Sequence, residues 1–236
     1  MTAPPFLRLA AASLCALACS DSTSTTYDPV IPTDWVGSID NPYFPLAPGT
    51  IWQYAAQTAD GLETTRVEVL ATQVMINGVA ATTVLDQVSL DGSLVEETHD
   101  WYAQDGDGNV WYLGEDSKEY ENGQVTSTAG SWTWGVDGAL PGVLMWADPA
   151  GHVGIEYRQE FSKGVAEDWG KITDLGRSVT VPAGSYTGCV TTEDWDGSKP
   201  FEPREHKAYC PGVGIVRSVD VGAEAQPEEL TSVTRP

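Results

Sequence analysis

Basic residues are scarce in this chain. Its 236 residues include 12 Lys and Arg against 34 Asp and Glu, which gives a formal net charge of -22. A surface this acidic repels phosphate groups, so the composition excludes binding to nucleic acid or to an anionic lipid surface by counterion release. We therefore expect no nucleic-acid partner.

Long apolar runs are missing too, apart from one at the N-terminus. Residues 1–18 carry a single charge, Arg8, before an apolar run that is too short to span a bilayer and is typical of a signal peptide. The order Ala-Leu-Ala before Cys19 resembles a bacterial lipobox, so we expect a lipid on Cys19. Leucine more commonly stands three places before that cysteine, and here it stands two places before, so cleavage without lipidation stays the alternative.

The segment after Cys19 has little that could pack. Residues 20–26 are small and polar, which predicts a flexible, lipid-anchored tether over 19–40 and a single β domain over 41–236. Five prolines between residues 27 and 48 predict an extended lead-in that packs on the domain. Ser20 is not the acidic residue that retains some lipoproteins at the inner membrane, so we expect an outer-membrane protein.

Cysteines are few, and each has an expected fate. Cys15 leaves with the signal peptide and Cys19 takes the lipid, which leaves Cys189 and Cys210. In an exported protein such a pair is expected to form a disulfide. A thiol or metal pair is the competing interpretation, but the CxxC spacing typical of that chemistry is missing.

Helical periodicity is absent, and short strands separated by turn residues take its place. Asn77-Gly78, Asp91-Gly92 and Asn122-Gly123 are strong hairpin signals. About ten antiparallel strands in one run must curl or close. We predict an all-β fold with little helix, in which an antiparallel meander forms a curved half-barrel, a barrel or a clam-like sheet. The expected strands cover 50–59, 62–76, 79–90, 93–104, 109–120, 124–134, 152–161, 169–175, 178–181, 184–194, 205–209, 214–221 and 229–233.

Several longer motifs resemble a family of secreted bacterial β-rich proteins of unassigned function. They are NPYFPLAPGTIWQY (41–54), DWYAQDGDGNVWYLGED (100–116), GSWTWGVDGALPG (130–142), YRQEFSKGVAED (157–168) and YCPGVGIV (209–216). The resemblance implies export and a β fold, and no activity comes with it. The Pro-Gly pair ahead of Trp52 and Tyr54 is more loosely similar to half-barrel envelope lipoproteins related to lipoprotein carriers.

Oxygen-bearing side chains alternate at Asp105, Asp107 and Asn109, with Asp116 at the twelfth position. This pattern suits the hard oxygen ligands of Ca²⁺, although the glycine and the flanking helices of an EF-hand are missing. An acidic hairpin turn accounts for the same residues. We predict no cofactor and keep a weak calcium site open.

Histidine, at three residues, is also rare. Glu97, His99 and Trp101 share one face of a predicted strand, and His206 lies near Glu202 and Glu205 in a late segment. A metal site could form if the two groups met, but neither HxH nor HExxH occurs. Solvated strand faces are the alternative.

The sequence contains no Gly-x-Ser-x-Gly nucleophile elbow. Glu160 and Asp168 are weak catalytic candidates, with Glu156 and Glu167 near them, because paired carboxyl groups can perform acid and base catalysis on glycosidic bonds. Arg158, by neutralising neighbouring acids, offers a structural explanation. The catalytic residues therefore stay unknown.

Tryptophan is abundant, at nine residues. Exposed examples on a concave sheet favour sugar rings or apolar ligands, whereas buried ones form core. The candidates for a ligand cleft are Trp101, Trp111, Trp134 and Trp146. We predict a lipid-anchored envelope protein that acts as a non-enzymatic module and binds an apolar or amphipathic ligand or an envelope partner. A secreted carboxylate-dependent hydrolase and a purely structural surface protein are the alternatives.

Overall fold

The computed structural model describes residues 27–199, 201–221 and 226–236. The predicted signal peptide, Cys19 and the first part of the tether lie outside the described residues. Within these ranges, no helix combines the length and the apolar character needed to cross a membrane.

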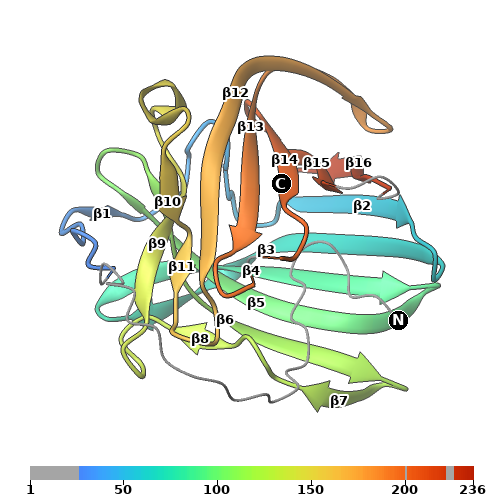
Figure 1. Ribbon diagram of the computed structural model, residues 1–236, viewed down its shortest axis with the longest axis horizontal. Coiled ribbons are helices and arrows are strands. Elements are labelled where there is room, and N and C mark those ends of the chain that lie inside the picture. Colours follow the sequence, from blue (N-terminus) through green and yellow to red (C-terminus); the bar gives the residue numbers. More distant parts are fainter. Residues whose placement is uncertain (1–26, 200, 222–225) are drawn as a thin grey trace.

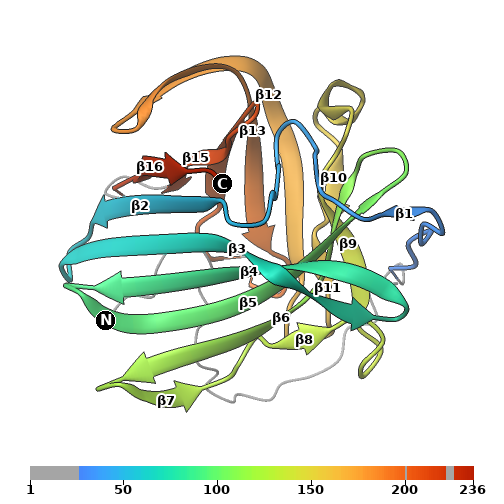
Figure 2. The same cartoon turned by 180° about the vertical axis from the view of Figure 1, so that it is seen from behind.

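The described chain forms one antiparallel sheet that curls into a nearly closed barrel (Figures 1 and 2), which confirms the predicted fold class. Its main path runs β10-β12-β13-β14-β15-β16-β2-β3-β4-β5-β6-β9-β11, and β1, β7 and β8 pair beside it. A single 3-10 turn, η1, is the only helical element among the described residues. The elements are β1 (Trp35–Val36), β2 (Ile51–Gln57), β3 (Leu62–Ile76), β4 (Val79–Leu90), β5 (Ser93–Asp105), β6 (Val110–Glu121), β7 (Gln124–Ser127), β8 (Trp132–Thr133), β9 (Leu140–Met145), η1 (Pro149–His152), β10 (Glu156–Arg158), β11 (Glu160–Phe161), β12 (Asp168–Val181), β13 (Gly184–Asp196), β14 (Glu205–Cys210), β15 (Gly214–Asp220) and β16 (Glu228–Thr234).

Two-residue turns set the register of the early hairpins. Asn77 and Gly78 both have positive φ angles, 48° and 84°, as a type I′ turn requires. Asp91-Gly92 and Asn122-Gly123 repeat this pattern. Because such turns match the twist of the flanking strands, β3 pairs with β4, β4 with β5, and β6 with β7 along the chain.

The barrel closes through residues 156–161. The first half of this segment, β10, pairs with β12, and the second half, β11, pairs with β9. The seam of the sheet therefore lies within one continuous piece of chain. At Gly142 of β9 a Cβ atom would lie 2.4 Å from the Arg158 carbonyl oxygen, so only glycine permits this approach.

The proline-rich lead-in packs on one end of the barrel. Trp35–Val36 pairs with β5, and the backbone amide of Asn41 donates to Gln104 Oε1 at 2.9 Å. The Phe44 ring lies 5.3 Å from the ring of Tyr102. The packed unit thus begins before residue 41, the boundary expected from the sequence, and the described part of the predicted tether contacts the domain. We call this the lead-in end.

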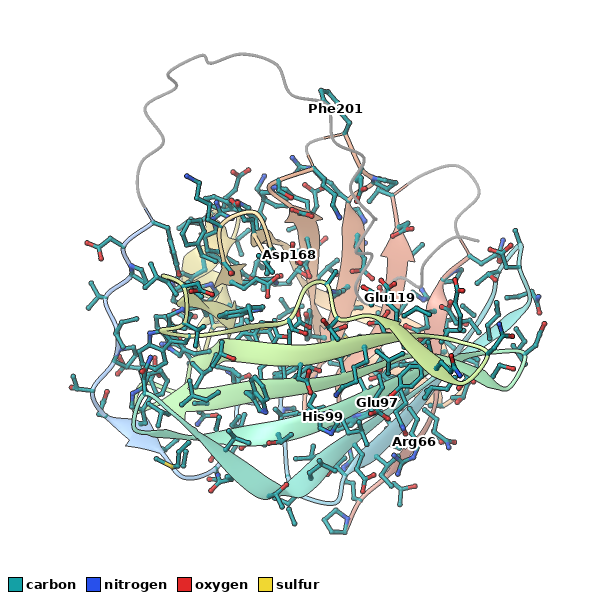
Figure 3. All side chains as sticks on the ribbon, turned by 90° about the horizontal axis from the view of Figure 1, so that it is seen from below. Arg66, Glu97, His99, Glu119, Asp168 and Phe201 are labelled. Atoms are coloured by element: carbon teal, nitrogen blue, oxygen red, sulfur yellow. A yellow bond between two sulfur atoms is a disulfide. The ribbon has the colours of Figure 1, made fainter. Side chains whose placement is uncertain are left out.

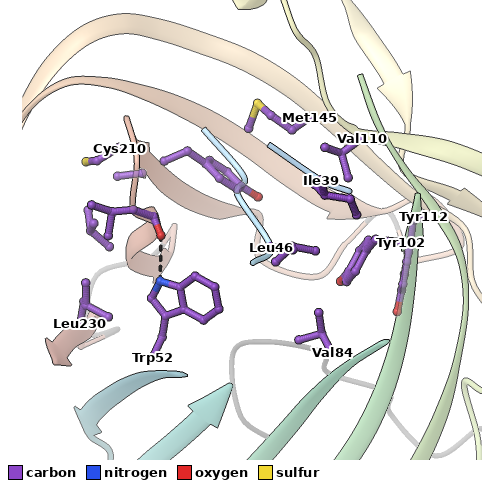
Figure 4. Packing of buried hydrophobic residues seen from close by; sticks show 14 of the residues in the cluster. Ile39, Leu46, Trp52, Val84, Tyr102, Val110, Tyr112, Met145, Cys210 and Leu230 are labelled. Carbon is purple, nitrogen blue, oxygen red and sulfur yellow. Dashed lines mark hydrogen bonds between the residues drawn. The ribbon is translucent and has the colours of Figure 1, made fainter. Parts of the chain in front are cut away.

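The largest apolar cluster lies at the lead-in end (Figure 4). Trp52, Val84, Tyr102 and Tyr112 converge there with Leu46 of the lead-in. The indole of Trp52 donates from Nε1 to the Val213 carbonyl oxygen at 2.7 Å. Burying these rings is the main contribution to the stability of this end.

The predicted disulfide is confirmed. Cys189 of β13 and Cys210 of β14 are bonded, and both are fully buried in the same cluster. The bond links two neighbouring strands next to the turn where the Gly212 amide donates to the Pro42 carbonyl oxygen of the lead-in.

Candidate ligand site

The inner face of the barrel changes its chemistry along the strands. On β5 the residues that line the interior run from Tyr102, beside the lead-in, through Asp100 and Thr98 to Glu96. On β6 Tyr112 is followed in the same way by Glu115. We call the region of Asp86, Glu96, Asp100, Glu115, Glu160 and Asp168 the acidic end.

A bulge on β6 sets this arrangement. Tyr112 pairs with Tyr102 and Gly114 with Trp101, so one extra residue on β6 sits between these pairs. Gly114 has a φ of 144°, and a Cβ atom there would lie 2.5 Å from the Trp132 carbonyl oxygen. Because the bulge resets the alternation of the strand, Glu115 faces inward directly opposite Asp100.

A cavity of about 130 Å³ lies between the two ends. It is close in size to an engineered cavity that accepts one benzene molecule. Its aromatic wall is made by rings from four strands and the lead-in, and its polar wall by the acidic end and Lys207. The residues that line it are Phe44, Pro45, Leu46, Trp52, Tyr54, Val67, Val84, Asp86, Glu96, Thr98, Asp100, Tyr102, Tyr112, Glu115, Leu144, Gln159, Glu160, Asp168, Lys207, Tyr209, Gly214 and Ile215.

The carboxyl groups that line the cavity differ in their hydrogen bonds. Asp100 Oδ1 accepts from the Tyr112 hydroxyl at 2.5 Å, and Glu160 Oε2 accepts from Trp132 Nε1 at 2.7 Å. Glu115 is 2% exposed, yet neither of its oxygens has a hydrogen-bond partner in the described part of the chain. A buried carboxyl group without hydrogen bonds destabilises the folded state, and binding of a ligand or a proton at Glu115 relieves this destabilisation.

Burial raises the pKa values of the carboxyl groups at this end. The pKa of Asp100 rises to about 7 through desolvation, although the hydrogen bond from Tyr112 opposes the change. The pKa of Asp168 also rises to about 7, through desolvation and the nearby Asp196. Desolvation and the charge of Glu160 hold the pKa of Glu115 well above its usual range. The site is therefore prepared to hold protons or a cation near neutral pH.

Lys207 is the only cation among the cavity-lining residues. Its ammonium group lies 3.1 Å from Glu205 Oε2 and 3.2 Å from Asp194 Oδ2. These two carboxylates raise the pKa of Lys207 despite its desolvation. Lys207 is therefore engaged by Asp194 and Glu205, neither of which lines the cavity.

The structure brings together two of the four acidic candidates from the sequence. Glu160 and Asp168 both line the cavity. Glu156 instead pairs with Lys171 at 2.8 Å, and Glu167 pairs with Arg158 at 3.3 Å, as the structural explanation expected.

The tryptophans proposed for a ligand cleft, Trp101, Trp111, Trp134 and Trp146, do not line this cavity. Trp111 is buried and donates from Nε1 to Asp105 Oδ2 at 2.8 Å. Trp146 stacks on His152 with ring centroids 3.9 Å apart. Trp101 and Trp134 pack against the second apolar cluster. The aromatic wall is instead made by Trp52, Phe44 and four tyrosines, Tyr54, Tyr102, Tyr112 and Tyr209.

The calcium candidates Asp105, Asp107 and Asn109 lie at the β5–β6 turn, and Asp116 lies on β6. Both oxygens of Asp105 accept hydrogen bonds within the turn, Oδ1 from the Asn109 amide at 2.8 Å and Oδ2 from Asn109 Nδ2 at 2.9 Å. Asp116 pairs with Lys118 at 2.6 Å. Asp107 completes the set, and calcium binding by these residues stays a prediction.

The histidine candidates lie in two separate places. Glu97 and His99 are on β5, and they lie apart from Asp168 of the cavity in Figure 3. His206 lies near Glu193, with 3.4 Å between Nε2 and Oε2. Among residues 27–199, 201–221 and 226–236, no group of three or more His, Cys, Asp or Glu side chains could hold a metal ion.

Comparison with known proteins gives two similar folds. No protein-family model and no curated protein sequence matches this chain. Its structure is similar to a Bacteroides fragilis protein that is provisionally described as exported, with a YmcC-like fold, at a TM-score of 0.49 and 16% identity over 82% of this chain and 99% of that one. It is also similar to a provisionally described lipoprotein of Parabacteroides distasonis, with a TM-score of 0.42 and 15% identity over 82% of this chain and 99% of that one. These values are too low to carry an argument about function.

Proposed function

We propose that this protein is a lipid-anchored component of the bacterial envelope, held at the outer membrane, whose barrel binds one small amphipathic molecule without catalysing a reaction. The observation that carries the proposal is the cavity itself. Its aromatic wall suits the apolar part of a ligand, and its acidic end suits a polar part.

The geometry supports a small ligand. A cavity of about 130 Å³ is large enough for one ring or a short chain. Tyr102 and Tyr112 stack on each other with centroids 4.8 Å apart, Phe44 packs edge-on against Tyr102, and all three rings line the cavity. Such preorganised rings lose little conformational entropy when a ligand binds.

Native mass spectrometry of the full chain, purified gently from its own envelope, tests this proposal. We expect a stoichiometric adduct, which an organic extract of the same sample identifies. Val67→Phe, which fills the cavity, should abolish the adduct, whereas Val74→Phe, at a 38% exposed position of the same strand, should retain it. A bare protein mass in every variant overturns the binding proposal and favours a structural surface protein.

The anchor has its own test. Cys19→Ser removes the proposed lipid site, so we expect the variant to move from the membrane fraction to the soluble fraction of the envelope. Unchanged membrane association of the variant contradicts lipidation at this residue.

A second candidate function is carboxylate-dependent hydrolysis, because Glu160 and Asp168 both line the cavity. Desolvation and the charge of Asp168 raise the pKa of Glu160 well above its usual range, which suits a general acid. Turnover of a glycoside panel by the native protein, lost in Glu160→Gln and Asp168→Asn, is the expected result for this candidate. Equal turnover by both variants removes it.

A further inference from the structure

The charges that line the cavity are not balanced. Its lining includes six carboxyl groups and one lysine, and that lysine is already paired with Asp194 and Glu205. A bound molecule that brings a positive charge offsets this imbalance where the protein itself does not.

Resting on the proposed function, we propose that the ligand carries a protonated primary amine, and that Glu115 receives this amine at the acidic end of the cavity. The apolar body of the ligand then lies toward Tyr102 and Tyr112. This assignment makes the molecule an amphipathic amine of about one ring in size.

The position of Glu115 carries the proposal. Its side chain is 2% exposed, lines the cavity and has two oxygens without a hydrogen-bond partner in the described residues. It stands directly across from Asp100 in the β5–β6 register. Two ionised carboxyl groups on facing strands repel each other, and an ammonium group there donates hydrogen bonds to both.

Hydrogen-bond chemistry distinguishes between types of cation. The unpartnered oxygens of Glu115 need donors, which a primary ammonium group has and a quaternary ammonium group lacks. A metal ion is disfavoured, because in the described ranges no three acidic, histidine or cysteine side chains converge as ligands. The Tyr112 hydroxyl donates to Asp100, so a carboxyl group and an aromatic side chain that both line the cavity lie together, as an amine with an apolar body requires.

Protons compete with the amine for these carboxyl groups. Desolvation, followed by the charges of Glu160, Asp100, Asp168 and Glu96, raises the pKa of Glu115 and favours its protonated form. Because the pKa of Asp100 and that of Asp168 are about 7, both are mostly neutral at pH 5.5 and mostly ionised at pH 8. Binding of a cation is therefore expected to strengthen as the pH rises through about 7.

Isothermal titration of the full chain in lipid nanodiscs, with 2-phenylethylamine and its neutral isostere 2-phenylethanol as probes, tests the inference. At pH 8 we expect the amine to bind at least about tenfold more tightly than the alcohol. The amine should lose about tenfold in affinity at pH 5.5, whereas the alcohol should change little. N,N,N-trimethyl-2-phenylethylammonium, which has no N–H donor, should bind more weakly than the amine.

Glu115→Gln removes the charge and keeps the shape. We expect this variant to bind the amine about tenfold more weakly and the alcohol as before. Glu121→Gln makes the same charge change at an exposed position of the same strand and should bind both probes normally. The pH series on the native protein needs no variant, so it decides even if Glu115→Gln misfolds.

Two results overturn the inference. Equal binding of amine and alcohol at pH 8 removes the amine assignment and leaves the proposed binding function standing. Binding of neither probe also removes it, and the adduct sought by native mass spectrometry then decides separately whether the cavity has another kind of ligand.

Discussion

The two ends of the barrel interior share strands β4, β5 and β6 but differ in how their buried side chains are satisfied. At the lead-in end the rings of Trp52, Tyr102 and Phe44 are packed, and the indole of Trp52 has a hydrogen-bond acceptor. At the acidic end Glu115 is equally buried and has no hydrogen-bond partner in the described residues. The first end is organised as a core, and the second carries groups that a core excludes.

This difference indicates which end serves function. Asp100 faces Glu115, and Glu96 faces Glu119, across one pair of strands. Facing like charges and buried carboxyl groups reduce the free energy of unfolding, so packing does not explain their presence. Departures from stable design are expected at functional sites.

The largest change in the free energy of unfolding is expected from removing the disulfide at the lead-in end. Replacing Cys189 and Cys210 together by alanine removes a bond that closes a loop of 21 residues. We expect a loss of about 3 kcal/mol in the free energy of unfolding, measured by urea denaturation at pH 7. A loss below about 1 kcal/mol contradicts the view that this end provides the stability.

The second largest change in the free energy of unfolding is expected at the acidic end and depends on pH. The pKa of Glu96 rises from 4.5 to about 7, mainly through desolvation and the charge of Glu119, so the folded state binds its proton more tightly than the unfolded state. Stability from this group is fully present below pH 4.5 and is lost as the pH rises through about 7. From pH 5 to pH 8 we expect Glu96 alone to lower the free energy of unfolding by about 2 kcal/mol.

Thermal or urea unfolding across this pH range measures the effect. Glu96→Gln should flatten the curve, and Glu121→Gln should leave it unchanged, because Glu121 is exposed. A protein that is more stable at pH 8 than at pH 5 contradicts the desolvation of the acidic end.

A smaller change in stability is expected at Glu115, where one substitution distinguishes a role in folding from a role in ligand binding. Glu115→Met replaces an unsatisfied carboxyl group by an apolar side chain, and we expect a gain of about 1 kcal/mol at pH 7.5 together with loss of amine binding. Glu121→Met is the matched control and should change neither quantity. Destabilisation by Glu115→Met shows that the group has a structural role.

The smallest change in the free energy of unfolding is expected for a carboxyl group outside the cavity. Glu97 bonds to Gln87 Nε2 at 2.9 Å and does not line the cavity, so Glu97→Gln should change the free energy of unfolding by less than about 0.5 kcal/mol. Probe binding should stay the same. A rise in melting temperature with added Zn²⁺ that Glu97→Gln abolishes revives the metal hypothesis.

Local sequence signals were enough to predict much of the fold. The strands expected at 62–76 and 79–90 occur with these bounds, because Asn77-Gly78 fixes their turn. The disulfide followed from export and cysteine count. The strands expected at 169–175 and 178–181 are one strand, β12, which continues past Gly176 at a φ of 75° where a break was expected.

The site was harder to predict, because both faces of its strands are polar. On β5 Glu96 and Asp100 alternate with Glu97 and His99, so period-two alternation does not tell which face points inward. On β6 the bulge at Gly114 changes the alternation before Glu115. Glu160 and Asp168 were predicted because paired carboxyl groups can act as acid and base. No local sequence signal distinguishes the tyrosines that line the cavity from tyrosines of the core.

The most direct test of the central claim is a nitrogen–proton correlation spectrum of the tryptophan indoles of the full chain, recorded during titration with 2-phenylethylamine. The indole of Trp52 lines the cavity, and that of Trp132 bonds to Glu160. We predict that these two resonances shift with the ligand while those of Trp111 and Trp146 stay in place. Shifts of Trp111 or Trp146 with an unchanged Trp52 contradict a ligand site inside the barrel.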